Sequence, residues 1–297
     1  MNKILSAIIV LLIIGFGVYY WTTQRDAAEV PEPTQETEEP VVTETETPVD
    51  DTKTVIGKSV DGRDIVAYHF GKGEREVLFV GGMHGGYSWN TALLAYELKE
   101  YLERTPSAVP ANVKVTVIPV LNPDGLNLVV GTSSRFSKAD VSDSEPTRIA
   151  GRFNAHDVDL NRNFDCEWKE SAKWQNKTVS AGSAPFSEPE SKALRDYVEK
   201  HTLSAVVVWY SSAGGVFPST CDGQPSSDSL ALTDAYAKAA GYKAFNDFDF
   251  YEITGDMPNW LSTRDIPAIS VLLTTHDSTE WTKNQKGIDA ILKSVAR

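Results

Sequence analysis

Short apolar runs along the chain predict the order of its elements. Four runs rich in Val, Ile and Leu are typical of strands that are buried on both faces of a sheet. They cover residues 76–82, 113–121, 204–210 and 267–274. Between them, apolar residues recur at helical spacing, which predicts a helix beginning near Asn90 with Leu94, Leu98, Tyr101 and Leu102 on one face.

Three further helices complete this pattern. One is predicted to begin at Ser187-Glu188-Pro189-Glu190, where Ser187 can cap the helix and Pro189 is tolerated in the first turn. The others cover residues 227–240 and 284–296. The alternation of strands and helices predicts an α/β fold with a mainly parallel or mixed sheet covered on both faces. In such folds the active site lies at the carboxyl ends of the strands.

The N-terminal apolar run differs from the others in its length. Residues 4–21 carry no charge, and a helix of that length reaches about 27 Å, close to the thickness of a bilayer core. Lys3 precedes the run, and Tyr19, Tyr20 and Trp21 end it, as aromatic residues do at a membrane interface. The sequence thus predicts a cytoplasmic start at residues 1–3, a single transmembrane anchor and a C-terminal domain outside the cytoplasm. A cleaved signal peptide is the alternative.

Most of the net negative charge of the chain lies in residues 22–53. The chain of 297 residues has a net charge of −13, but residues 26–52 hold ten acids and no Lys or Arg, which leaves −3 for the rest. With its Pro, Thr and Glu, this stretch is predicted to be a disordered acidic linker. An acidic recognition tail is the alternative. Residues 54–297 are long enough for one domain. Their near-neutral charge argues against nucleic acid as a partner.

Polar motifs follow the predicted strands. GGMHGGYSWN ends the first strand (81–90), PVLNPDG the second (119–125) and WYSSAGGV the third (209–216), and GRFN, VDLNRNF, SEPES and YEITG lie at 151–154, 158–164, 187–191 and 251–255. In this order the motifs resemble those of the zinc carboxypeptidase family, the carboxypeptidase A-like metallopeptidases. The resemblance implies a mixed eight-stranded sheet flanked by helices and a shallow funnel that binds peptide C-termini. It also implies a zinc ion held by two His and one Glu, with a second Glu as general base.

The residues that grip the substrate in this family have counterparts here. By resemblance, Asn161 and Arg162 match the pair that binds the terminal carboxylate, and a guanidinium fork suits that group. Arg152 matches the arginine that polarises the carbonyl and stabilises its oxyanion. Tyr251 matches the mobile tyrosine, and Asp159 matches the carboxylate that orients the first metal histidine.

The metal and base positions do not match. His84 stands in the first ligand's place, but Tyr87 or Ser88 occupies the position of the ligand Glu, and Ser211 that of the second His. Leu272 occupies the position of the general base. Catalytic zinc takes three protein ligands plus water, and leucine can neither accept a proton nor activate water. The sequence therefore predicts a divergent, inactive member of the family that binds little or no zinc and still binds peptides.

The same residues could instead have purely structural roles. His84 could be a buried histidine hydrogen-bonded to Asp159, and the arginines could pair with Asp124, Asp159 or Asp165. Tyr251 could be ordinary packing. His69, His156, His201 and His276 have no metal-ligand spacing and are interpreted as structural or surface residues.

Cys166 and Cys221 are the only cysteines. Outside the cytoplasm an even pair predicts a disulfide, with two free thiols as the alternative.

Three functions follow from these observations. The first is an anchored domain that binds peptide C-termini, of cell-wall peptides or of a partner protein, without cleaving them. The second is a working metallocarboxypeptidase that takes missing ligands from elsewhere, for instance Asp256, Asp124 or another chain. The third is a hydrolase in which His84, backed by Asp159, activates Ser88 or Ser211.

Overall fold

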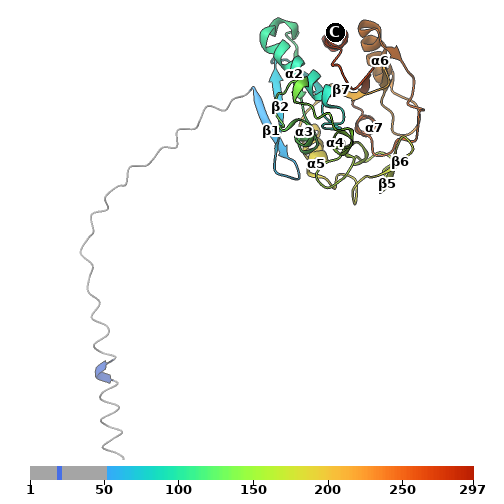
Figure 1. Ribbon diagram of the computed structural model, residues 1–297. Coiled ribbons are helices and arrows are strands. Elements are labelled where there is room, and N and C mark those ends of the chain that lie inside the picture. The colour runs from blue at the N-terminus through green and yellow to red at the C-terminus, as the bar shows by residue number, and fades with distance from the viewer. Residues whose placement is uncertain (1–18, 22–51) are drawn as a thin grey trace, which may run out of the picture. The chain divides into compact units, whose positions relative to one another are not determined.

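A computed structural model describes residues 19–21 and 52–297, and residues 52–297 form one compact unit. Its eight-stranded mixed sheet has the order β1-β2-β4-β3-β7-β10-β8-β9 (Figure 1). The strands are β1 (Lys53–Lys58), β2 (Asp64–Phe70), β3 (Arg75–Val80), β4 (Val113–Ile118), β7 (Leu203–Ser211), β8 (Gly215–Pro218), β9 (Lys243–Ala244) and β10 (Ala268–Leu273). The four central strands β4, β3, β7 and β10 are parallel, whereas β2 pairs antiparallel with β4 and β8 with β10. The predicted mixed eight-stranded sheet is thereby confirmed.

Helices cover both faces of the sheet (Figure 1). They are α2 (Trp89–Arg104), α3 (Pro123–Val130), α4 (Glu145–Ala150), α5 (Pro189–Lys200), α6 (Ser227–Ala240), α7 (Met257–Ser262) and α8 (Trp281–Val295), with 3-10 turns at Pro106–Ala108, Lys138–Asp140 and Leu160–Arg162. On β3, Val77 and Phe79 belong to the core under α2, α6 and α8, whereas Leu78 and Val80 belong to the core under α5 and α7. This alternation explains why the central strands are apolar at nearly every position.

A separate two-stranded hairpin, β5 (Ser171–Trp174) and β6 (Lys177–Ser180), lies outside the main sheet (Figure 1). Its buried side chains Ala172, Trp174 and Val179 form a small core of their own with Ala181. The hairpin brings Trp174 to the carboxyl ends of the central strands, where the site described below lies.

The predicted single-pass membrane location is contradicted. Within residues 19–21 and 52–297, no helix is long and apolar enough to cross a bilayer. The longest, α2, has 16 residues and includes charged side chains such as Glu97 and Lys99, whereas a membrane-spanning helix needs about 20 apolar residues. Residues 4–18 of the predicted anchor and residues 22–51 of the predicted linker lie outside the described residues.

Candidate functional site

A cavity of about 660 Å³ lies at the carboxyl ends of β3, β7 and β10. Most of the residues singled out from the sequence line it, and they come from segments far apart in the chain: His84, Tyr87, Arg152, Asn161, Arg162, Ser211, Tyr251 and Leu272. Ser88 and Asp159 lie behind the wall, with exposures of 1% and 0%. The strand ends thus bring the motifs together, as the topology of an α/β sheet predicts.

His84 stands beside Asp159 at the position of the family's first metal ligand. Its Nε2 lies 3.4 Å from Asp159 Oδ1, and neither ring nitrogen has a hydrogen-bond partner among the described residues. Burial, together with the positive charge of Arg152, lowers the pKa of His84 to about 4. The imidazole is therefore neutral near pH 7.

The neighbouring positions do not supply further metal ligands. Tyr87 turns its ring against Trp174 and His276, with ring centroids 5.0 and 4.7 Å apart. Ser88 Oγ is buried and has no hydrogen-bond partner in the described part of the chain, and Ser211 Oγ donates to Asn90 Oδ1 at 2.8 Å. Nowhere in residues 19–21 and 52–297 do three or more His, Cys, Asp or Glu side chains gather as a metal site would require. A single imidazole with neighbouring hydroxyl groups does not provide the three protein ligands that a catalytic zinc takes.

The same geometry can be compared with the third predicted function, a hydrolase in which His84 activates Ser88 or Ser211. Such an enzyme needs its serine within hydrogen-bond reach of the histidine. His84 forms no hydrogen bond with Ser88 or Ser211, and Ser211 is already engaged by Asn90. The site contains Ser, His and Asp without joining them into a triad.

Arg152 is a buried cation with a single carboxylate partner. It is 2% exposed, and its Nε and Nη2 donate to Asp159 Oδ2 at 2.9 and 2.8 Å. Burial alone would raise the pKa of Asp159, but the charge of Arg152 and the contact with His84 hold it well below its ordinary value. The guanidinium also lies 4.3 Å above the ring of Trp174. Arg152 is thus fixed in place and neutralised.

Arg162 is a buried cation without a carboxylate partner. It is 1% exposed, its Nε donates to Lys173 O at 2.9 Å and its Nη1 donates to Asn161 O at 2.6 Å. Among the described residues, no Asp or Glu forms an ion pair with it. Its printed hydrogen bonds go to neutral carbonyls, and the charges of Asp159 and Asp256 act on it only without direct contact. An anion entering the cavity would give this buried charge a partner in direct contact.

Asn161 is held from both ends of its amide. Its Nδ2 donates to Asp256 Oδ2 at 2.8 Å, and its Oδ1 accepts from Tyr210 OH at 2.9 Å and from the backbone N–H of Met257 at 3.2 Å. Because an amide nitrogen has two hydrogens, one remains for a ligand. Burial raises the pKa of Asp256, whose other oxygen accepts from the backbone of Asn259.

An aromatic wall, which the motifs did not indicate, completes the cavity. Phe217, Phe248, Phe250 and Tyr251 line it, and successive rings lie 5.0–5.7 Å apart. Three of the four come from one segment, FNDFDFY at 245–251, whose density of Phe is the signal that sequence reasoning overlooked. Trp174, His276 and Asp256 also line the cavity, although His276 was interpreted as structural or surface.

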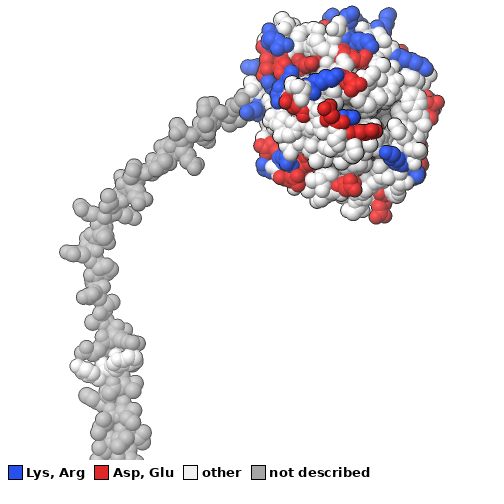
Figure 2. All heavy atoms as spheres, viewed as in Figure 1, with Lys and Arg blue, Asp and Glu red and all other residues white. Residues whose placement is uncertain are grey.

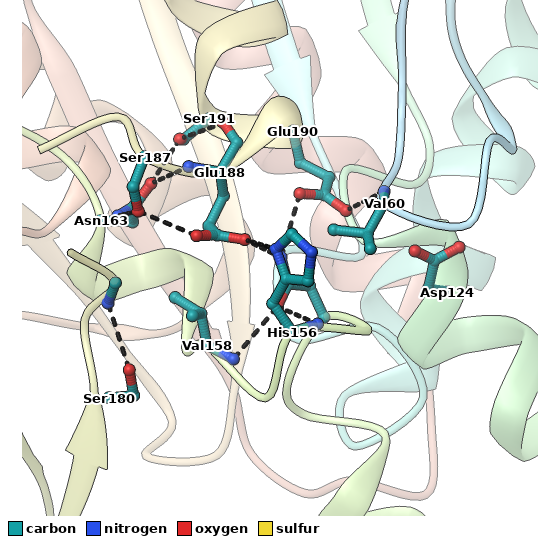
Figure 3. Close-up of polar contacts among 12 residues, drawn as sticks. Val60, Asp124, His156, Val158, Asn163, Ser180, Ser187, Glu188, Glu190 and Ser191 are labelled. Carbon is teal, nitrogen blue, oxygen red and sulfur yellow. Dashed lines mark hydrogen bonds and ion pairs between the residues drawn. The ribbon is translucent and has the colours of Figure 1, made fainter. Parts of the chain in front are cut away.

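A buried polar network joins the start of α5 to the segments that follow Arg152 and Arg162, and Figure 3 shows the part of it around Glu188 and Asn163. Asn154 Nδ2 donates to Glu188 and Glu190 at 2.8 and 3.1 Å. Asn163 Oδ1 accepts from the backbone of Glu188 at 3.1 Å and from Ser191 Oγ at 2.6 Å. The start of α5 therefore holds Asn154, two residues after Arg152, and Asn163, the residue after Arg162.

The predicted disulfide between Cys166 and Cys221 is confirmed, with Cα atoms 5.6 Å apart. Cys166 O accepts from Gly255 N at 2.7 Å, next to the segment that carries Tyr251. Gly255 has φ +64°, and a Cβ there would come within 2.0 Å of Arg162 O. Only glycine allows the segment to pass so close to Arg162.

Comparison with known proteins agrees with this fold. A sequence profile described as zinc carboxypeptidase matches residues 43–286. Gamma-D-glutamyl-L-diamino acid endopeptidase 1 of Lysinibacillus sphaericus is 22% identical over 217 residues, 67% of this chain and 54% of that protein. The chain thus spans little more than half of that relative's length.

Solved structures share the fold. Thrombin activatable fibrinolysis inhibitor has a TM-score of 0.66 and 16% identity, covering 82% of this chain and 69% of that one. Murein-tripeptide amidase MpaA of Escherichia coli O157 has a TM-score of 0.55 and 18% identity, covering 82% of this chain and 92% of that one. With the profile covering most of its length, the chain belongs to the zinc carboxypeptidase family.

Proposed function

We propose that this zinc carboxypeptidase-family domain binds the C-termini of peptides without hydrolysing them. The observation that carries the proposal is Arg162, a buried guanidinium that lines the cavity and forms no direct ion pair with any Asp or Glu of the described residues. A terminal carboxylate would supply the missing counter-charge through charge-assisted hydrogen bonds. Asn161 offers one further N–H beside it.

The absence of hydrolysis follows from the groups around His84. Leu272 lines the cavity where a base would stand, and the carboxylate beside His84, that of Asp159, is paired with Arg152. Within residues 19–21 and 52–297, no group of three or more His, Cys, Asp or Glu side chains forms a metal site there. The two acids considered as substitutes are engaged elsewhere: Asp124 binds Arg63 at 2.6 Å, and Asp256 binds Asn161 and Asn259. Without a metal or a base, the domain lacks the means to activate water.

The ligand is a peptide rather than a nucleic acid. On the face that Figure 2 shows, Lys and Arg side chains are interspersed with Asp and Glu, and they form no continuous basic field of the kind that phosphate backbones need. The L. sphaericus relative and the E. coli amidase are named for peptide and murein substrates. Cell-wall peptides and protein C-termini therefore both belong in the binding assay.

Three measurements on the purified protein test the proposal. Calorimetry compares peptides ending in a free carboxylate with their C-terminal amides, and we expect binding only with the carboxylate. Elemental analysis after incubation with zinc should find well under one zinc per chain. Mass spectrometry of the incubated peptides should find no residue released. Stoichiometric zinc together with chelator-sensitive release of the last residue would refute the proposal in favour of an active metallocarboxypeptidase.

A further inference from the structure

Asn90 joins three segments that meet beside the cavity. It is fully buried in the first turn of α2. Its Nδ2 donates to Thr275 O at 2.8 Å and to Ser278 O at 2.9 Å, in the loop between β10 and α8. Its Oδ1 accepts from Ser211 Oγ at 2.8 Å, at the end of β7. Asn90 therefore uses both of its amide hydrogens and its amide oxygen within the protein.

These contacts fix the direction of the hydrogen bond between Ser211 and Asn90. Carbonyl oxygens only accept, so the amide of Asn90 has to turn its NH2 group toward Thr275 O and Ser278 O. Its Oδ1 then faces Ser211, and because an amide oxygen also only accepts, Ser211 has to donate. A serine hydroxyl has a single hydrogen, and this one is committed to Asn90. Ser211 Oγ can therefore offer a ligand only its lone pairs.

Ser211 is a cavity-lining acceptor that lacks a donor. Its side chain is half-buried and lines the cavity. Within the described part of the chain, no side chain or backbone N–H donates to its Oγ, and Leu273, its partner in the register with β10, is apolar. A ligand that displaces water from this oxygen has to replace the lost hydrogen bond. The ligand therefore needs a hydrogen-bond donor at this point.

The carboxylate-binding end of the cavity has the opposite polarity. Arg162 and the remaining N–H of Asn161 are donors. Tyr210, which precedes Ser211 in β7, donates through its OH to Asn161 Oδ1 at 2.9 Å. Ser211 is thus separated from this pair by little more than the length of one tyrosine side chain, a span that about two extended residues of a peptide cover.

We propose that Ser211 Oγ accepts a hydrogen bond from a backbone N–H in the last two residues of the peptide whose carboxylate lies at Arg162. The ligand is then recognised by two groups of opposite polarity, its carboxylate and an amide N–H. Ser211 stands at the position of the family's second zinc histidine, so this binding role belongs to the substituted residue. The inference rests on the proposed function, because the carboxylate at Arg162 sets the position of the peptide.

The test uses calorimetry with the acetylated dipeptide Ala-Phe and two analogues that keep its terminal carboxylate. In one analogue an ester oxygen replaces the N–H of Phe, and in the other an ester oxygen replaces the N–H of Ala. We expect the wild-type protein to bind one of the two esters at least about five-fold more weakly than the dipeptide, because the Ser211 oxygen then faces an acceptor. In Ser211→Ala, that ester and the dipeptide should bind within about two-fold of each other.

Ser226→Ala is the matched control. Ser226 caps α6 and does not line the cavity, and its hydroxyl likewise donates one side-chain hydrogen bond, to Ser229 Oγ at 3.1 Å. This variant should keep the full preference for the dipeptide over the ester. Loss of the preference in Ser226→Ala as well would trace the effect to stability and overturn the role of Ser211.

The remaining outcomes separate this inference from the proposed function. Equal affinity of the wild-type protein for the dipeptide and both esters would overturn the hydrogen bond to Ser211 while leaving the carboxylate site intact, and this comparison needs no variant. An ester penalty that persists unchanged in Ser211→Ala would show that another group accepts the N–H. Failure to bind the dipeptide and both esters would overturn the proposed function and this inference with it.

Discussion

At the scale of single residues, the two cavity arginines differ in a way that their sequence motifs do not reveal. Arg152 forms a direct ion pair with Asp159, whereas the hydrogen bonds of Arg162 go to the carbonyl oxygens of Lys173 and Asn161. A family motif indicates which residue types meet in the site. The pairing of each charge depends on side chains from other segments, and only the folded structure decides it.

We therefore predict that Arg162→Lys weakens the binding of carboxylate-terminated peptides at least about ten-fold. Lysine keeps the charge but loses the planar fork that bonds a carboxylate at two points. Calorimetry with a peptide that ends in a free carboxylate measures the effect. Arg135→Lys, at an exposed arginine paired with Glu100, is the control and should bind normally. Wild-type affinity in Arg162→Lys would mean that the carboxylate does not contact this residue.

A second residue-scale feature is Glu76, a buried acid in β3 away from the cavity. It accepts hydrogen bonds from Thr116 Oγ1, Tyr197 OH and Lys114 Nζ at 2.6, 2.5 and 3.2 Å, and His201 Nδ1 lies 2.9 Å away. Burial alone would raise the pKa of Glu76, but these hydrogen bonds and the charge of Lys114 lower it to about 2. The folded state thus favours the ionised form.

This pKa predicts acid sensitivity of the fold. A carboxyl group whose pKa falls on folding stabilises the protein above its unfolded pKa of about 4.5, and this contribution is lost as the pH falls toward 2. The depression corresponds to about 3 kcal/mol. The difference in unfolding free energy between wild type and Glu76→Gln should shrink by that order between pH 5 and pH 2. Glu103→Gln, at an exposed acid, should show no such change, and a pH-independent difference for Glu76→Gln would contradict the prediction.

At the scale of elements, the buried central strands could be predicted from the sequence, whereas the outer strands of the sheet and the separate hairpin could not. The apolar runs predicted β3, β4, β7 and β10 to within three residues at each end, because strands covered on both faces need apolar side chains throughout. The outer strands β1, β2, β8 and β9 and the β5–β6 hairpin are short or partly exposed. Their formation depends on pairing with distant segments, which leaves little local signal.

The start of α5 shows how tertiary contacts shift a predicted boundary. Ser187 was predicted to cap this helix, but the helix begins at Pro189, Glu188 is the N-cap and it makes no side-chain capping bond. Ser187 Oγ instead donates to Glu188 Oε1 and accepts from Asn163 Nδ2. The polar groups of the SEPES motif thus belong to the buried network around Glu188 and Asn163 (Figure 3).

This network predicts a coupling between α5 and ligand binding. Glu188 Oε2 accepts from Asn154 Nδ2 at 2.8 Å and lies 2.7 Å from His156 Nδ1. Glu188→Gln replaces one acceptor oxygen by an NH2 donor, so either Asn154 Nδ2 or Ser187 Oγ loses its acceptor at this side chain, which costs about 1–3 kcal/mol. Since Asn154 follows Arg152 by two residues, the affinity for carboxylate-terminated peptides should fall as well.

A matched variant separates positioning from a general loss of stability. Thr116→Val removes a buried hydrogen-bond partner of Glu76, in a network remote from the cavity, at a similar cost. Denaturation should show both variants to be destabilised, and calorimetry should show weaker binding for Glu188→Gln alone. If Glu188→Gln loses stability and keeps wild-type affinity, α5 supports the fold without positioning the site.

At the scale of the whole molecule, the disulfide joins two parts of the site that the sheet alone does not hold together. Cys166 follows the Asn161–Arg162 motif, and Cys221 lies in the loop after β8, 55 residues further along the chain. Through Gly255, the Cys166 segment also contacts the chain that carries Tyr251 and Asp256. Short helices and loops, rather than regular sheet, carry the residues that line this side of the cavity.

The disulfide is therefore predicted to contribute about 4 kcal/mol to stability, because it closes a loop of this length in the unfolded chain. The double variant Cys166→Ser/Cys221→Ser should lose that amount of unfolding free energy in urea. At temperatures where it remains folded it should still bind carboxylate-terminated peptides, because Arg162 keeps its backbone partners and Phe164 still pairs with Gly255 at 3.0 Å. A stability loss below about 1 kcal/mol would show that the unfolded chain is already restricted without the disulfide. Loss of binding in the folded variant would show instead that the disulfide itself holds the cavity in shape.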